Sequence, residues 1–259
     1  MYNTILSEKS GSVLKITLNR PDVYNAFNTE MLGELHEAFK NAAADDEVRS
    51  VILTGAGKAF CSGQDLKDFS DKKLTFKEAL EQRYNPLIKS IAYLNKPVIC
   101  AINGVAAGAG LSLALACDYR IAVENATLIE VFINVGLVPD SGSSFFLPRM
   151  IGYAKAFEMC VTGDKMTAKE AKEFGLVNKI VSNNELLKKS AGITARKFAE
   201  RPTKAVGMIK DLLNKSFESS LDEILQLEGD YQEQAGNTED FKEGIASFLE
   251  KRKSVFKGK

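Results

Sequence analysis

Two segments of this 259-residue chain repeat one order of features: a buried strand, a turn of small residues, and a helix. The strand SVILT (50–54) leads into GKAFCSGQDLKDF (57–69), and PVICAIN leads into NGVAAGAGLSLALACD (103–118). Small residues let a ligand approach the backbone, and free amides at a helix start favour negative charge. Two such turns on neighbouring strands would aim two amides at one point and stabilise a carbonyl oxygen that gains negative charge. Close packing of helix on strand explains many Gly/Ala turns equally well.

The pattern of apolar residues elsewhere predicts further strands and helices. ILSEK and VLKITLN form a predicted hairpin joined at Ser10-Gly11, and residues 28–44 have helical spacing with Asn28 or Thr29 as the N-cap. A helix at roughly 79–94 precedes PVICAIN. This alternation of strands and helices predicts an α/β core with parallel strands.

The end of the chain is predicted to be helical. Four amphipathic segments follow one another, at 185–198, 203–217, 221–235 and 239–250. We therefore expect one α/β core domain at 1–198 and a C-terminal helical region at 199–259.

Composition excludes several classes of protein. Lys plus Arg and Asp plus Glu number 34 each, so no net charge draws the chain to nucleic acid or to an anionic membrane. No run approaches 18 apolar residues, and the start lacks a basic-then-apolar signal, which predicts a soluble cytoplasmic protein. Four scattered cysteines and a single histidine, His36, predict no metal site. Neither glycine-rich segment matches a nucleotide-phosphate motif.

Six segments, taken in order along the chain, resemble the crotonase (enoyl-CoA hydratase/isomerase) superfamily. They are NRPDVYNAFN (19–28), GKAFCSGQDLKD (57–68), KPVICAINGVAAGAGLSLALACDYRIA (96–122), VGLVPDSGSSFFLPR (135–149), TGDKMTAKEAKEFGLVNKIV (162–181) and FLEKRKSVF (248–256). The resemblance implies a spiral of ββα units with a C-terminal helical trimerisation region, assembled as a homotrimer or a dimer of trimers. It also implies an acyl-CoA substrate and no separate cofactor, because coenzyme A is part of the substrate.

The resemblance also assigns roles to residues. The backbone amides of Gln64 and Ala109 would form an oxyanion hole for the thioester carbonyl. The family usually has glycine at the position of Ala109, an exchange that leaves the amide in place. Positions matching those that cradle coenzyme A are Tyr24, Asn25, Ala26, Ser62, Asp65 and Leu66. Lys251 and Lys257 either meet its phosphates, from a neighbouring subunit, or belong to a solvated face.

Both glutamates of the family's hydratases are absent. The first position, three residues after the glycine run, is Ser112, and the second, seven residues before Pro139, is Phe132. Neither side chain carries a proton near neutral pH, so efficient hydration is not expected. Glu130 lies two residues from the second position and would replace that glutamate only through a local shift.

Asp140, in GLVPDSGSS, is the carboxylate that the chain offers instead. One interpretation is an N-cap for a helix that begins near Ser143. The resemblance supplies another, since some isomerases and a dehalogenase of the superfamily have a catalytic aspartate here. A dehalogenase also needs a histidine base and a tryptophan-lined pocket, but this chain has no Trp and only the mid-helix His36.

A single carboxylate suits a proton shift between two carbons beside the thioester. Burial in apolar surroundings would raise the pKa of Asp140, which helps it accept and release a proton. The stretch VPDSGSSFFLPR looks most like ring 1,2-epoxyphenylacetyl-CoA isomerases, with Phe132, Phe145 and Phe146 as candidates for an acyl pocket or for plain core. Alternatives are a Δ3,Δ2-enoyl-CoA isomerase, an enoyl-CoA hydratase, or a non-catalytic CoA- or RNA-binding relative.

Overall fold

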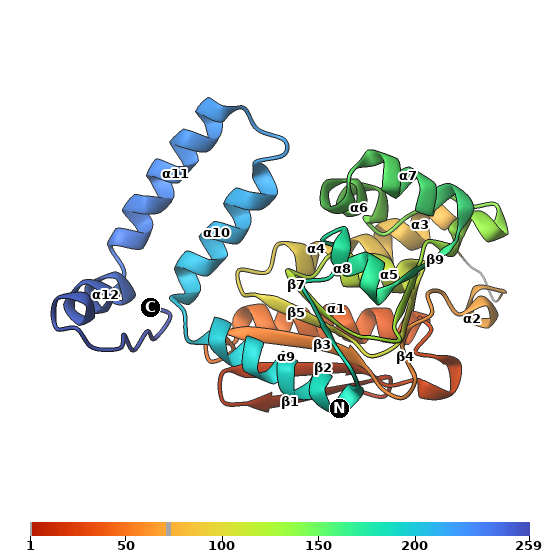
Figure 1. Cartoon of the computed structure of the whole chain (residues 1–259), viewed down its shortest axis with the longest axis horizontal. Helices are drawn as coiled ribbons and strands as arrows, with labels where there is room; N and C mark the ends of the chain where they lie inside the picture. Colours follow the sequence, from red (N-terminus) through yellow and green to blue (C-terminus); the bar gives the residue numbers. More distant parts are fainter. Residues whose placement is uncertain (1, 71–73) are drawn as a thin grey trace.

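The computed structural model describes residues 2–70 and 74–259, and two β-sheets form its centre (Figure 1). The first sheet has the order β1 (Ile5–Ser10), β2 (Val13–Leu18), β3 (Ser50–Gly55), β5 (Val98–Ile102), β7 (Tyr119–Val123) and β10 (Lys179–Val181). The second has the order β4 (Ala59–Cys61), β6 (Val105–Ala107), β8 (Thr127–Ile129) and β9 (Lys165–Thr167). The strands β3, β5 and β7 belong to the first sheet, and the next strand in each case belongs to the second. The chain therefore winds as the predicted spiral of ββα units.

The register of the sheets agrees with the predicted α/β core. The strands β1 and β2 form the predicted antiparallel hairpin, and β2, β3, β5, β7 and β10 pair in parallel. The strand β5 is buried along its whole length, as expected for a parallel strand covered on both faces. Parallel pairing places the ends of neighbouring strands at one edge, and the turns after β4, β6 and β8 meet there.

Helix α1 (Thr29–Ala44) begins where the pattern predicts. The side chain of Asn28 accepts a hydrogen bond from the Met31 amide and so caps the helix. Its apolar face (Met31, Leu32, Leu35, Ala38, Phe39, Ala42) is buried in the core. Helix α9 (Asn184–Ala199) packs across the strands of the first sheet.

The predicted helix at 79–94 is a continuous helical run from Phe76 to Ala92 that contains a π-helical turn. Thr75 and Glu78 form a capping box for α3 (Phe76–Ala79), a π-helical turn η2 follows (Leu80–Tyr84), and α4 (Asn85–Ala92) completes the segment. A π-helical turn widens the helix locally and often occurs at functional sites. Here it lies beside the pocket described below.

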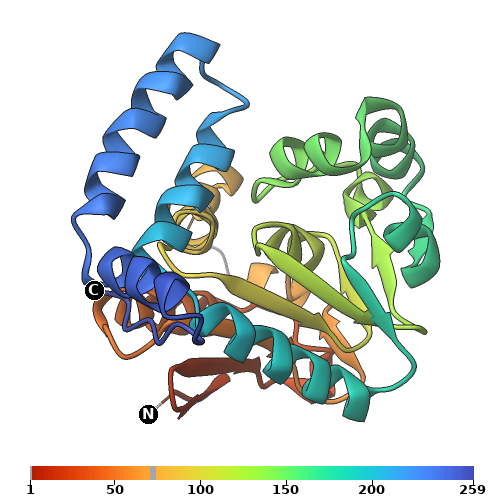
Figure 2. The ribbon, with the colours of Figure 1, turned by 60° about the vertical axis from the view of Figure 1, so that its left-hand side comes forward.

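Three helices follow α9 and stand apart from the sheets, α10 (Thr203–Lys215), α11 (Leu221–Gly236) and α12 (Glu239–Leu249) (Figures 1 and 2). Their bounds agree closely with the predicted segments. Arg49 ties them to the core through Thr203 Oγ1, at 2.8 Å, and through the backbone carbonyls of Arg201 and Phe256. The domain division at residue 198 stays a prediction. No helix among the described residues is long and apolar enough to cross a membrane.

Candidate active site

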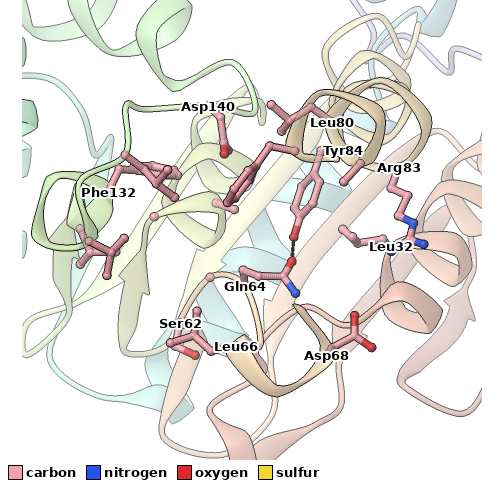
Figure 3. Close-up of a pocket in the computed structure, with 18 of the residues that line it drawn as sticks. Leu32, Ser62, Gln64, Leu66, Asp68, Leu80, Arg83, Tyr84, Phe132 and Asp140 are labelled. Carbon is pink, nitrogen blue, oxygen red and sulfur yellow. Dashed lines mark hydrogen bonds between the residues drawn. The ribbon is translucent and has the colours of Figure 1, made fainter. Parts of the chain in front are cut away.

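A pocket of about 640 Å³ lies where the turns after β4, β6 and β8 meet, beside the π-helical turn η2 (Figure 3). Its floor includes Ser62, Gly63 and Gln64 after β4, and Gly108 and Ala109 after β6. Helix α5 (Ala109–Leu115) starts at this floor, and the 3₁₀ turn η3 (Val131–Val135) closes one side. Three segments far apart in the sequence therefore share one cavity.

The amides of Gln64 and Ala109 are available in this pocket. Phe27 bonds to Gly63 and Asp65 on either side of Gln64, and this parallel pairing leaves the Gln64 amide directed away from Phe27. Ala109 is the first residue of α5, so its amide has no partner within the helix. Neither amide donates in the turns, loops and caps of the described chain.

Gly63 brings the two turns into contact. A methyl group added at Gly63 would lie 2.9 Å from the Ala107 carbonyl oxygen and 3.7 Å from the Ala109 amide nitrogen. Gly63 also has a φ of 94°, which favours glycine. The structure thus brings both predicted oxyanion-hole positions to one small area of the pocket floor.

Asp140 lines the same pocket (Figure 3). Helix α6 (Ser143–Ile151) has Gly142 as its N-cap and no side-chain cap, so the interpretation of Asp140 as the capping side chain is wrong. The Ser141 hydroxyl donates to the Asp140 carboxylate at 2.7 Å. Burial raises the pKa of Asp140, and the hydrogen bond from Ser141 opposes part of that rise. A carboxylate with a raised pKa is suited to accepting and releasing a proton.

The two positions that hold glutamate in hydratases contribute no carboxylate here. The Ser112 hydroxyl is fully buried and donates to the backbone carbonyl of Asp140 at 3.0 Å. The Phe132 ring lines the pocket, as predicted, and a methyl group added at Gly108 would lie 3.8 Å from it. The second carboxylate among the described lining residues, Asp68, already accepts from the amide and hydroxyl of Thr29.

Phe145 and Phe146 do not line this pocket in the described structure, so their prediction as acyl-pocket residues is not supported. The Arg149 guanidinium lies 3.6 Å from the centroid of the Phe145 ring, and the two phenylalanine rings meet edge to face. His36 lies within α1 and does not line the pocket either.

The residues predicted to cradle coenzyme A lie side by side. The Ser62 amide donates to the Tyr24 carbonyl at 3.1 Å, and Arg20 forms an ion pair of 2.9 Å with Asp65. Tyr24 and Leu66 are exposed, as a binding surface requires. The Asn25 side chain is fully buried and donates to the carbonyls of Ala56 and Ala59, so it cannot contact a ligand.

For the other positions in this group, including buried Ala26, a CoA contact stays a prediction. Lys251 and Lys257 belong to the C-terminal segment that follows α12, and α12 lies across the molecule from α2 (Leu66–Ser70) (Figure 1). In this chain they do not line the pocket.

Tyr84 lines the pocket from the π-helical turn, and no pattern in the sequence indicated this role. Its hydroxyl donates to the Gln64 side-chain oxygen (Figure 3), and its ring meets Phe27 edge to face. Burial raises the pKa of Tyr84, helped by the negative charge of Asp140. Tyr84 is therefore a neutral hydrogen-bond donor that holds Gln64 against the pocket wall.

Glu130 lies behind the pocket, fully buried between β8 and η3. The Ser143 hydroxyl donates to its Oε1 atom, and Oε2 has no partner within the described residues. Burial raises the pKa of Glu130 to about 7, the bond from Ser143 opposes the rise, and the charge of Asp140 adds to it. Glu130 is not among the described residues that line the pocket, whereas Phe132, at the position of the missing glutamate, is.

The buried Glu130 should make stability fall with pH. The folded protein keeps the Glu130 proton up to about pH 7, whereas the unfolded chain releases it near 4.5. Raising the pH through this window therefore lowers the free energy of unfolding, by about 1.4 kcal/mol per pKa unit and about 3 kcal/mol in all. In Glu130→Gln this loss should disappear. Urea denaturation of both proteins across the window tests this, and parallel curves would contradict it.

Comparison with known proteins agrees with this geometry. Residues 8–259 match the family described as enoyl-CoA hydratase/isomerase. The chain is 42% identical, over the full length of both proteins, to the 1,2-epoxyphenylacetyl-CoA isomerase of Escherichia coli. It is 39% identical to a probable enoyl-CoA hydratase of Rhodobacter capsulatus, covering 100% of this chain and 99% of that one.

Solved structures agree as well. An enoyl-CoA hydratase subunit from Geobacillus kaustophilus superposes with a TM-score of 0.93 at 35% identity, covering 100% of this chain and 99% of that one. A putative enoyl-CoA hydratase from Streptomyces coelicolor gives 0.94 at 30% identity, covering 100% and 96%. The spiral of ββα units, the match over residues 8–259 and these full-length relatives together show that the chain belongs to the enoyl-CoA hydratase/isomerase family, with the crotonase fold.

Proposed function

We propose that the protein is an isomerase of acyl-CoA thioesters that uses Asp140 as its single acid and base. The observation that carries the proposal is the presence, in one pocket, of the Asp140 carboxylate and the Gln64 and Ala109 amides, which have no partner in the turns, loops and caps of the described chain. The reaction is a proton shift along the acyl chain or the rearrangement of a ring epoxide to an oxepin. Coenzyme A belongs to the substrate, and no further cofactor is invoked.

In the proton shift, ionised Asp140 removes a proton from the carbon next to the thioester carbonyl. The C–H bonding electrons pass to the carbonyl oxygen, which becomes an enolate oxyanion held by the two amides. Each such donor typically contributes two to three powers of ten in rate. Asp140 then returns the same proton two carbons further along the chain, and the double bond moves into conjugation. No water is consumed.

The acyl group is proposed to lie among the apolar side chains of the pocket. These include Leu32, Leu80, Tyr84, Phe132 and Leu137. A cavity of about 640 Å³ with aromatic walls accommodates a ring as well as a short unsaturated chain. The E. coli relative that bears the name 1,2-epoxyphenylacetyl-CoA isomerase supports the epoxide substrate and a place in phenylacetate catabolism. A Δ3,Δ2-enoyl-CoA isomerase of fatty acid metabolism is the second candidate, since the same groups would perform it.

Turnover of two thioesters should test the proposal and rank its two forms. We expect the protein to isomerise 3-hexenoyl-CoA, and to rearrange the 1,2-epoxide of phenylacetyl-CoA with a kcat/KM about ten-fold higher. Product analysis by liquid chromatography and mass spectrometry distinguishes the positional isomers and the oxepin. Equal values would favour the linear-chain isomerase, and turnover of neither thioester would refute the assignment as an isomerase.

We also propose assembly as a homotrimer or a dimer of trimers. The segment from α10 to α12 exposes large apolar side chains that no described part of this chain covers, including Leu213, Phe217, Leu221, Phe248 and Leu249. Exposed apolar surface of this kind marks an interface. Light scattering on the eluted protein should give three or six times the 28.4 kDa chain mass. A monomer at micromolar concentration would refute this.

A further inference from the structure

The segment that carries Asp140 has a strained backbone. Ser141 has a φ of 52° and Gly142 a φ of 84°, so two successive residues adopt the left-handed conformation. For serine this conformation costs about 1 kcal/mol. A turn of this kind keeps its shape only when surrounding contacts hold it.

Two hydrogen bonds to the Asp140 backbone carbonyl stabilise this turn. The Ser143 amide and the Ser112 hydroxyl both donate to that oxygen, each at 3.0 Å. Besides its amide, Ser143 also donates through its hydroxyl, and the acceptor is the Glu130 carboxyl group. Ser143 thus joins the Asp140 turn to a fully buried carboxyl group that the proposed chemistry does not use.

We propose that Glu130 is a positioning residue, which holds Ser143 at the first turn of α6 and thereby aims the Asp140 carboxylate at the reacting carbon. This inference rests on the proposed role of Asp140. The titratable groups that act on Glu130 are Asp140 and, from α7 (Tyr153–Thr162), the Cys160 thiol. Ser143 is the hydrogen-bond donor that the described structure gives to Glu130. This tether between Glu130 and the Asp140 turn therefore depends on a single hydrogen bond.

The tether explains why a carboxyl group remains in the interior. A buried polar group is costly unless it is hydrogen-bonded, and one oxygen of Glu130 has no partner in the described part of the chain. An apolar side chain would avoid that cost but would leave the Ser143 hydroxyl without its acceptor. Displacing a catalytic group by about 1 Å can lower a rate about a hundred-fold.

Three substitutions test the tether through kcat and KM separately. Glu130→Leu removes the acceptor and Ser143→Ala removes the donor, while Glu130→Gln keeps an oxygen for the serine. We expect the first two to lower kcat at least about ten-fold on a thioester that the wild type isomerises, with KM within about two-fold. Glu130→Gln should retain at least about a third of kcat. Ser190→Ala, at a buried serine of α9 whose hydroxyl has no partner among the described residues, is the control.

The outcomes separate this inference from the proposed function. Unchanged kcat in both Glu130→Leu and Ser143→Ala would overturn the tether, and so would equal losses in Glu130→Gln and Glu130→Leu. Thermal unfolding of each variant gives the folded fraction by which kcat is corrected, and Ser143→Ala removes only one oxygen atom. If Asp140→Asn itself left turnover unchanged, the proposed function would fail whatever the Glu130 variants did.

Discussion

Asp140→Asn should lower kcat for isomerisation about a thousand-fold and leave thioester binding almost unchanged. The amide has nearly the same shape as the carboxylate, so the pocket keeps its walls, but it cannot accept the substrate proton. General acid–base groups typically contribute two to four powers of ten in rate. The measurement is kcat under saturating thioester, with binding of a non-reactive acyl-CoA followed by calorimetry.

The pH profile gives the same prediction a second test. Because burial raises the pKa of Asp140, the wild-type kcat/KM should rise with pH through a midpoint above the ordinary aspartate value of 3.8. The residual activity of Asp140→Asn should lack that rise.

Asp68→Asn is the matched control, since Asp68 lines the same pocket and is already bonded to Thr29. Its kcat should stay within about ten-fold of the wild type. A large loss of kcat in Asp68→Asn, with little loss in Asp140→Asn, would show that Asp68 and not Asp140 is the acid and base. Unchanged turnover of every thioester in Asp140→Asn would instead favour a non-catalytic CoA-binding role.

Hydration of crotonyl-CoA should be at least about a thousand times slower than isomerisation of 3-hexenoyl-CoA. Addition of water needs carboxyl groups that orient the water and move its protons. Ser112 is buried and bonded to the Asp140 carbonyl, and Phe132 presents a ring to the pocket. The measurement is formation of 3-hydroxybutyryl-CoA, quantified by chromatography against the isomerisation rate.

Rapid hydration would contradict the single-carboxylate mechanism. If Glu130→Gln abolished that hydration, Glu130 would be the second acid in spite of its place behind the pocket wall. The relatives named as enoyl-CoA hydratases make this comparison necessary.

Much of the fold could be predicted from local patterns. The hairpin, α1 and the four C-terminal helices followed from periodicity and turn or capping residues, because each carries apolar residues at strand or helix spacing. The π-helical turn at Leu80–Tyr84 did not follow, and with it Tyr84 was missed as a pocket residue. An extra residue in one helical turn leaves no compositional mark, since it depends on what the helix packs against.

The candidate active site also has features that the sequence predicted and features that depended on tertiary structure. The missing glutamates, Asp140 and the two glycine-rich turns were visible as residues. Whether Asp140 caps α6 or faces the cavity depended on the turn at Ser141 and Gly142, where the backbone is left-handed. Phe145 and Phe146 lie outside the described lining of the pocket, which their spacing in the sequence did not indicate. Asn25 matched a binding motif, yet its side chain satisfies buried carbonyls.

By itself, the sequence determined the family, the order of strands and helices, and which acid and base groups the protein possesses. Tertiary structure alone decided which of these groups share a cavity, because Gly63, Gly108 and Asp140 meet only when the turns of three successive ββα units close on one another. It also decided that Glu130 is buried behind the pocket and bonded to Ser143. Burial and distance act between residues far apart in the chain, and they set the pKa of a carboxyl group more strongly than its neighbours in sequence do.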